Sequence, residues 1–249
     1  MSPLSPLAWS LILGVAAAAA NVAGGLVVSR RHWNEILLKY FLAAGAGFML
    51  AATLLRMLPE SFSLMPRHAP LLILGGYFLV HFFEHTIAPH FHFGEEVHAD
   101  VMVNPAVGFS ALVGLSIHTF FDGVSIASGF LVSVPLGFLV FFAVFLHKIP
   151  EGFTVASIAL ASGRGERGAL AASLVLATAT LAGVLGMNHF AGAVAYALPV
   201  STGVTLYVAA SDLMPEVNEA RGIRMPLVVF LGVALFYAAE RALEAVGLS

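Results

Sequence analysis

Two short segments of the chain share a pattern in which a histidine is followed four residues later by an acid and then by a glycine. The histidines are His118 and His147, and the acids are Asp122 and Glu151. Because residues i and i+4 lie on one face of an α-helix, each segment presents an imidazole and a carboxylate side by side. Two imidazoles and two carboxylates form a ligand set that suits Zn²⁺ and its neighbours in the first transition row. The pattern therefore predicts a metal site.

The two segments are predicted to lie at the same depth along neighbouring antiparallel helices. A short turn at Ser133-Val134-Pro135 joins these helices, so residues equally far from the turn in sequence lie level. His118 is then level with Glu151, and Asp122 is level with His147. The nearer pair lies about 12 residues from the turn, or roughly 18 Å at 1.5 Å per residue. The four side chains should therefore converge near the middle of the two helices.

The composition places these helices in a membrane. Of the 249 residues, 59% are hydrophobic and 10% are charged, and the mean hydropathy is +0.94. Soluble domains have about 45–50% apolar and about 25% charged residues, so an ordinary soluble enzyme is excluded. The net charge of −3 provides no basic surface, which excludes nucleic acid as a partner. The chain has no cysteine, which excludes disulfides, thiolate metal ligands and cysteine nucleophiles.

The predicted fold class is an all-α polytopic membrane protein, with a single transmembrane domain over residues 1–249 and the lipid bilayer as its solvent. A membrane-spanning helix needs about 20 apolar residues, and eight stretches meet this requirement. They cover approximately residues 6–29, 36–58, 70–89, 106–131, 136–161, 168–188, 192–214 and 226–247. The first is interpreted as a span and not as a signal peptide, because no basic residue precedes it and its apolar run is too long.

The distribution of Lys and Arg predicts the orientation, because these residues accumulate in cytoplasmic loops. Most of them flank the loops after spans 1, 5 and 7, namely Arg30, Arg31, Lys39, Arg164, Arg167, Arg221 and Arg224. Only Arg56, Arg67 and Arg241 fall on the opposite side. Both termini should therefore face outward.

This orientation places the loop after span 3 in the cytoplasm. The loop carries His90, His92 and His98, with acidic residues between and after them. Histidines and carboxylates this close in sequence form a candidate cytoplasmic metal site. The alternative is an ordinary solvated polar loop.

An internal repeat appears when the sequence is compared with itself at an offset of 156 residues. The matched pairs include Gly47 with Gly203, Pro59 with Pro215, Glu60 with Glu216, Gly76 with Gly232 and Glu84 with Glu240. Spans 1–3 and 6–8 are therefore interpreted as two copies of one unit in opposite orientations, which gives a 3+2+3 arrangement around spans 4 and 5. Inverted repeats are typical of transporters, whose substrate site lies near the midplane between the copies.

The four-residue pattern also has interpretations other than a transport site. A buried acid at the centre of a membrane helix costs about 2.5–3.5 kcal/mol, which a bound dication would offset. A cluster of ion pairs and hydrogen bonds, or a proton relay, is one alternative. An intramembrane zinc-dependent hydrolase is another, although the chain lacks a His-Glu-x-x-His motif. Lys148, beside His147, either balances both carboxylates, pairs with a single acid or extends toward water.

These residues and this layout resemble the ZIP (Zrt-/Irt-like protein) family of divalent-metal transporters. The resemblance covers the whole chain, and its most specific elements are His118-x-x-x-Asp122-Gly123 and His147-Lys148-Ile149-Pro150-Glu151-Gly152. It implies transport of Zn²⁺, or of Fe²⁺, Mn²⁺ or Cd²⁺, toward the cytoplasm, with His118, Asp122, His147 and Glu151 as ligands. The short chain and its richness in Ala and Gly favour a bacterial inner membrane. Whether the chain forms a homodimer is left open.

The resemblance implies further candidate ligands. Met49 lies in a span-2 segment similar to one whose methionine reaches the transport site, with ordinary core packing as the alternative. Asp212 lies in a motif similar to the family's cytoplasmic exit, and Glu84 and His85 of span 3 are its candidate companions. Helix capping or pairing between the repeats would also account for these three residues.

Two positions depart from the pattern of family members that hold two adjacent metals. Those members have Asn after the span-4 histidine and an acid before the x-Pro-Glu-Gly of span 5. This chain has Thr119 and Lys148 at these positions, and span 6 has no acid to complete a second site. The sequence therefore predicts a single metal at the transport site.

Overall fold

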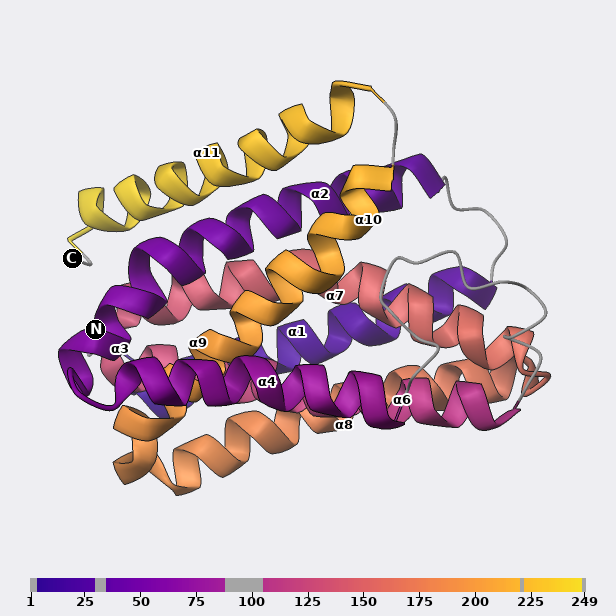
Figure 1. Ribbon diagram of the computed structural model, residues 1–249, viewed down its shortest axis with the longest axis horizontal. Helices are drawn as coiled ribbons and strands as arrows, with labels where there is room; N and C mark the ends of the chain where they lie inside the picture. Colours follow the sequence, from indigo (N-terminus) through magenta and orange to yellow (C-terminus); the bar gives the residue numbers. More distant parts are fainter. Residues whose placement is uncertain (1–3, 30–34, 88–104, 220–221, 248–249) are drawn as a thin grey trace.

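The computed structural model describes residues 4–29, 35–87, 105–219 and 222–247, and every regular element among them is a helix (Figure 1). The elements in chain order are α1 (Pro6–Ser29), α2 (Glu35–Ala52), η1 (Thr53–Met57), α3 (Leu58–Leu64), α4 (Ala69–Ile87), α6 (Pro105–Val132), α7 (Val134–Ala161), α8 (Gly165–His189), η2 (Ala191–Ala193), α9 (Val194–Tyr207), η3 (Val208–Leu213), α10 (Met214–Glu219) and α11 (Arg224–Ala245). His90, His92 and His98 lie outside the described residues. The all-α prediction is confirmed.

Seven helical segments of the described chain are long and apolar enough to cross a membrane. They are Pro6–Val28, Ile36–Leu64, Phe109–Val132, Val134–Ala161, Gly165–His189, Ala191–Leu213 and Arg224–Ala245. The remaining predicted span, span 3 at 70–89, forms α4, which is not among the seven. His81, Glu84 and His85 lower the hydropathy of its second half. Leu71, Leu74, Phe78 and Phe82 of α4 are nevertheless exposed, as expected for a helix that faces lipid.

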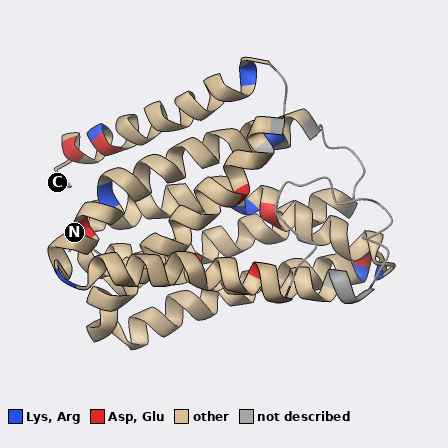
Figure 2. Ribbon diagram, in the orientation of Figure 1, with Lys and Arg blue, Asp and Glu red and all other residues tan. Residues whose placement is uncertain are grey.

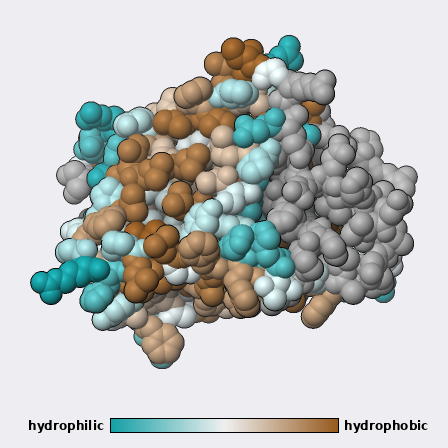
Figure 3. All heavy atoms as spheres, in the orientation of Figure 1, coloured by the Kyte–Doolittle hydropathy of each residue, from teal (hydrophilic) through white to brown (hydrophobic). Residues whose placement is uncertain are grey.

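The surface has the character of a membrane protein. The charged residues lie mostly toward two ends of the helical body, with a small group near its centre (Figure 2). Apolar side chains cover much of the face shown in Figure 3. The chain is therefore a multi-pass membrane protein, and its central charged group lies inside an apolar shell.

The helices pack in two sets. One set is a bundle of α1, α6, α7 and α8, which contact one another extensively. The other set consists of two helix pairs, α2 with α11 and α4 with α9, and α11 lies along α2 in Figure 1. The main apolar cluster joins the two sets, since Phe48 of α2, Leu139 of α7, Leu176 of α8 and Phe236 of α11 all belong to it.

Short connections fix the geometry inside the four-helix bundle. The predicted turn at 133–135 is reduced to Ser133, whose hydroxyl accepts a hydrogen bond from the Leu136 amide at 3.3 Å. Pro135 fits in the first turn of α7 because the amide that proline lacks has no helical partner there. At the other end of α7, Gly163 and Gly165 adopt φ of 76° and 64°, which glycine tolerates without strain. Both connections hold α7 antiparallel to its neighbours.

The 156-residue offset recurs in the packing. A Cβ on Gly47 of α2 would collide with the carbonyl oxygen of Val229 in α11. A Cβ on Gly203 of α9 would collide with the carbonyl oxygen of Ile73 in α4, and both members of this contact are related to the first by the same offset. The π-helices η1 and η3 are related by it as well. The pairs α2–α11 and α9–α4 are therefore equivalent in structure.

Gly152 permits the close crossing of α1 and α7, because a Cβ there would collide with the backbone of Asn21. We expect Gly152→Ala to lower the free energy of unfolding by about 1–3 kcal/mol, the usual cost of overpacking. Thermal unfolding of the purified protein in detergent checks this expectation. Gly186→Ala in α8 is the matched control, since, apart from the neighbouring backbone of α8, no atom of the described residues lies within 4 Å of the added methyl group. Equal melting temperatures for the two variants would contradict the expectation.

Candidate metal centre

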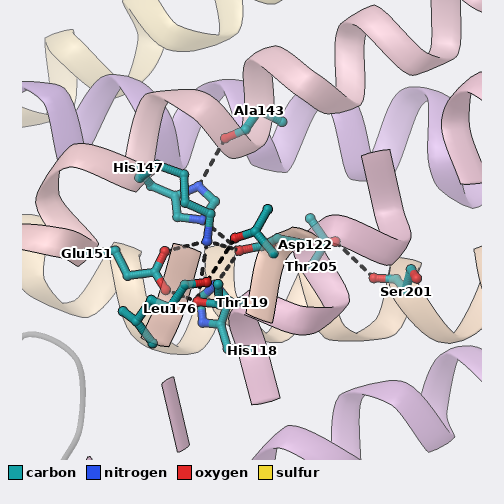
Figure 4. A network of polar contacts seen from close by, with 11 residues as sticks. His118, Thr119, Asp122, Ala143, His147, Glu151, Leu176, Ser201 and Thr205 are labelled. Atoms are coloured by element: carbon teal, nitrogen blue, oxygen red, sulfur yellow. Dashed lines mark hydrogen bonds and ion pairs between the residues drawn. The ribbon is translucent and has the colours of Figure 1, made fainter. Parts of the chain in front are cut away.

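The structure brings the four predicted residues together. Each of His118, Asp122, His147 and Glu151 offers one ligand atom, and these atoms all lie within 4.8 Å of one another. All four side chains are buried. They come from α6 and α7 in the middle of the four-helix bundle, as the register about the turn predicts (Figure 4). We call these residues the four-residue cluster.

Asp122 lies close to both histidines of the cluster. Its Oδ2 lies 3.2 Å from Nε2 of His118 and 3.4 Å from Nε2 of His147. The short distance to His147 confirms that these two residues lie level. The centres of the two imidazole rings are 5.6 Å apart. One carboxylate oxygen thus faces two ring nitrogens, an arrangement that suits a cation bound between them.

The backbone of α7 orients one of the imidazoles. Nδ1 of His147 lies 3.1 Å from the carbonyl oxygen of Ala143, one turn earlier. When Nδ1 carries the proton, it donates to this carbonyl, and Nε2 presents its lone pair to the cluster. Metal-binding histidines are commonly held in this way by a hydrogen bond at the second nitrogen. His147 is therefore oriented as a ligand would be.

Lys148 is fully buried and joins both acids of the cluster. Its Nζ lies 2.6 Å from Oδ2 of Asp122 and 2.5 Å from Oε2 of Glu151. It also donates to the hydroxyl of Thr119 at 3.4 Å, and that hydroxyl donates to Glu151 Oε1. Of the alternatives that the sequence left open, the balance of both carboxylates is the one that the structure adopts.

The candidate exit residues separate into two groups. Asp212 and Glu84 are buried and close enough for their charges to interact, and Glu84 forms a hydrogen bond with Tyr207. Oδ2 of Asp212 has no hydrogen-bond partner among the described residues. His85, in contrast, is exposed, and its ring lies 4.0 Å from that of His81 between centres. The structure therefore brings Glu84, but not His85, to Asp212.

Met49 is fully buried in α2, in the same apolar cluster as Ala143 of α7. Its equivalent in the repeat is Thr205 of α9, which lies beside Asp122 in Figure 4. The burial of Met49 among apolar residues agrees with core packing.

Sequence reasoning missed several partners of the candidate residues. Thr119 was treated only as a departure, although its position beside His118 puts it level with Pro150, next to Glu151. Tyr207 follows no motif, and nothing in the sequence alone connects it to Glu84. His81 and His85 are spaced i, i+4, which is a signal that they share a face.

Comparison with known proteins places the chain in a family. Residues 92–240 match the family model described as ZIP Zinc transporter. Zinc transporter ZIP13 of Danio rerio is 33% identical over 150 residues, which cover 55% of this chain and 42% of that protein. Zinc transporter ZIP4 of Homo sapiens is 32% identical over 122 residues, or 48% of this chain and 19% of that protein. The chain therefore spans less than half the length of these relatives.

The family match bears directly on the four-residue cluster, because the matched segment includes all of α6 and α7. The match is to a family of transporters and not of enzymes, so it gives the hydrolase interpretation no support. Since the matched residues make up more than half of the sequence, the chain belongs to the ZIP zinc transporter family.

Proposed function

We propose that this chain transports a divalent transition-metal ion, with zinc as the preferred substrate, through a single intramembrane site formed by His118, Asp122, His147 and Glu151. The observation that carries the proposal is the convergence of two imidazoles and two carboxylates in a buried cluster of a ZIP family member. Fe²⁺, Mn²⁺ and Cd²⁺ accept the same donor atoms. In this proposal the ion moves toward the cytoplasm. The protein lies in a bacterial inner membrane, with both termini on the outer side.

The inner part of the path runs past Asp212 and Glu84. The repeat supports this role, because the equivalents of these residues at the 156-residue offset are Arg56 and Glu240. Arg56 Nε lies 2.7 Å from Glu240 Oε1. In that copy of the repeat, the guanidinium of Arg56 therefore supplies the positive charge. The copy with Asp212 has an acid in place of the arginine and therefore attracts a free cation. The ion would then reach His90, His92 and His98 of the loop, and Met49 would add a sulfur ligand at the cluster.

Alternating access is part of the proposal, and the division of the helices into two sets supports it. All four members of the cluster and Lys148 lie on α6 and α7, within the four-helix bundle. The pairs α2–α11 and α4–α9 form the other set, and they correspond to spans 2, 3, 7 and 8 of the inverted repeats, whose spans 1 and 6 lie in the bundle. Movement of the bundle against these pairs would carry the site from one membrane face to the other.

The fixed ammonium of Lys148 limits the cluster to one ion, since it occupies space between Asp122 and Glu151. We expect a zinc titration of the purified protein, followed by equilibrium dialysis and elemental analysis, to assign one ion per chain to the cluster. The paired variant His118→Ala/His147→Ala measures the ions bound elsewhere, including any at the loop histidines. A difference of two ions between wild type and this variant would contradict a single site.

Zinc flux into proteoliposomes tests the function as a whole. Vesicles that contain the protein and a zinc-sensitive dye should fill faster than vesicles without protein, in proportion to the external zinc concentration up to saturation. Proton flux without zinc flux would instead favour a proton relay. Absence of any zinc flux from a folded, reconstituted chain would reject the proposal.

A further inference from the structure

Three buried serines of the described chain stand apart from the other buried hydroxyl groups. Ser125 and Ser128 of α6 and Ser201 of α9 are fully buried, and the hydroxyl of each has no hydrogen-bond partner among the described residues. The other buried serines and threonines donate to carbonyl or carboxylate oxygens, as Thr205 does to the Ser201 carbonyl at 2.9 Å. A buried hydroxyl without a partner loses the hydrogen bonds that it makes in water. These three hydroxyls are therefore expected to contact something other than protein.

The three serines lie at the interface between α6 and α9. Phe121, Ser125 and Ser128 are spaced i, i+4, i+7 and therefore share one face of α6. Phe121 packs against the apolar cluster that contains Val204 and Tyr207, so this face is turned toward α9. On α9 the same spacing relates Ala197, Ser201 and Val204.

Apolar contacts on both sides of the serines indicate how α6 and α9 are aligned along their length. Phe121 packs against the cluster that contains Val204, and both Phe121 and Ala197 pack against the cluster that contains Ala127. Ser201 lies between Ala197 and Val204 on α9, and Ser125 lies between Phe121 and Ala127 on α6. The two hydroxyl-bearing residues are therefore level across the interface between the moving bundle and the repeat helices.

This position is adjacent to the four-residue cluster. Ser125 follows Asp122 by three residues, which is slightly less than one helical turn, or about 4.5 Å along the axis. Figure 4 shows Ser201 on the side of Asp122 away from Glu151. Asp212 lies in η3, 11 residues after Ser201 and therefore farther toward the other end of this span. Under the proposed orientation, the serines lie on the outer side of the cluster, where the ion arrives.

We propose that Ser125 and Ser201 form a hydroxyl station that holds the arriving dication together with part of its water shell, before the ion is transferred to the four-residue cluster. A hydroxyl oxygen accepts hydrogen bonds from metal-bound water and can also replace one water as a ligand. Because the hydroxyls are neutral, they hold the ion less tightly than Asp122 does and so release it inward. Ser128 continues the polar face one turn farther out. The proposal rests on the proposed transport function.

The first arm of the test removes the hydroxyls. In Ser125→Ala/Ser201→Ala we expect the KM for zinc uptake into proteoliposomes to rise about tenfold, the effect of losing two hydrogen bonds. The Kd for zinc at the cluster, measured by equilibrium dialysis, should stay unchanged. Ser157→Ala is the control, because that hydroxyl donates to the Phe153 carbonyl of its own helix. An unchanged KM in the double variant would mean that the serines hold an ordered water only, and would overturn the proposal.

The second arm uses the absence of cysteine from the chain. Cd²⁺ added to Ser125→Cys/Ser201→Cys should produce a thiolate-to-cadmium charge-transfer absorption that neither single variant shows. The same pair with one thiol moved to Ser157 is the control. Absence of the absorption in the 125/201 pair would refute the station, whatever the transport result. A wild type that binds zinc but does not move it would refute transport alone, since the cadmium absorption is read without flux.

Discussion

Asp122→Asn should reduce zinc uptake by at least about 100-fold, the upper range for loss of groups that only support metal ligands. The change preserves the shape of the side chain and removes its charge. Asp122 interacts with both histidines of the cluster and with Lys148. The loss of the anion therefore affects both imidazoles and the buried ammonium at once. Initial rates of zinc entry into proteoliposomes measure the effect.

The control for this variant is Glu244→Gln, which removes an exposed acid that pairs only with Arg241 at 3.0 Å among the described residues. Its uptake should stay within about twofold of wild type, because exposed ion pairs contribute little. Zinc should also fail to raise the melting temperature of Asp122→Asn, while it does so for the wild type. Uptake by Asp122→Asn within twofold of wild type would place the transport site elsewhere.

The membrane fold could be predicted from the sequence because the bilayer imposes a strong length and hydropathy requirement on each helix. Predicted spans such as 6–29 and 136–161 agree with α1 and α7 to within two residues. The largest difference is at span 2, where the helical segment continues to Leu64 through η1 and α3. Pro59 lies at the start of α3, where proline is tolerated, so it does not end the segment.

The convergence of the cluster was also predictable, because a short turn fixes the register of two antiparallel helices. The pairing of Lys148 with both acids was not, since a long side chain can reach several partners and its rotamer depends on the surrounding packing. The separation of Glu84 from His85 follows from helical geometry. Tyr77, Val80 and Glu84 share a face, whereas the next residue is rotated by about 100° and belongs to the face of His81.

Lys148→Met should produce a protein whose stability depends on metal. The variant leaves Asp122 and Glu151 buried together without their cation, and breaking a buried ion pair by removal of one partner costs about 3–5 kcal/mol. Zn²⁺ can then supply the missing positive charge without competing with the ammonium. Added zinc should therefore raise the melting temperature of Lys148→Met by more than it raises that of wild type. Thermal unfolding in detergent with a chelator, and then with zinc, measures both effects.

Arg241→Met is the matched control, because it removes a cation whose side chain is 79% exposed. Its cost should be about 0–1 kcal/mol, and its response to zinc should equal that of wild type. A metal-free Lys148→Met protein as stable as wild type would mean that the two carboxylates do not need a cation. A bound dication would then not be needed to balance the negative charge of the cluster, and the single-site transport proposal would lose its physical basis.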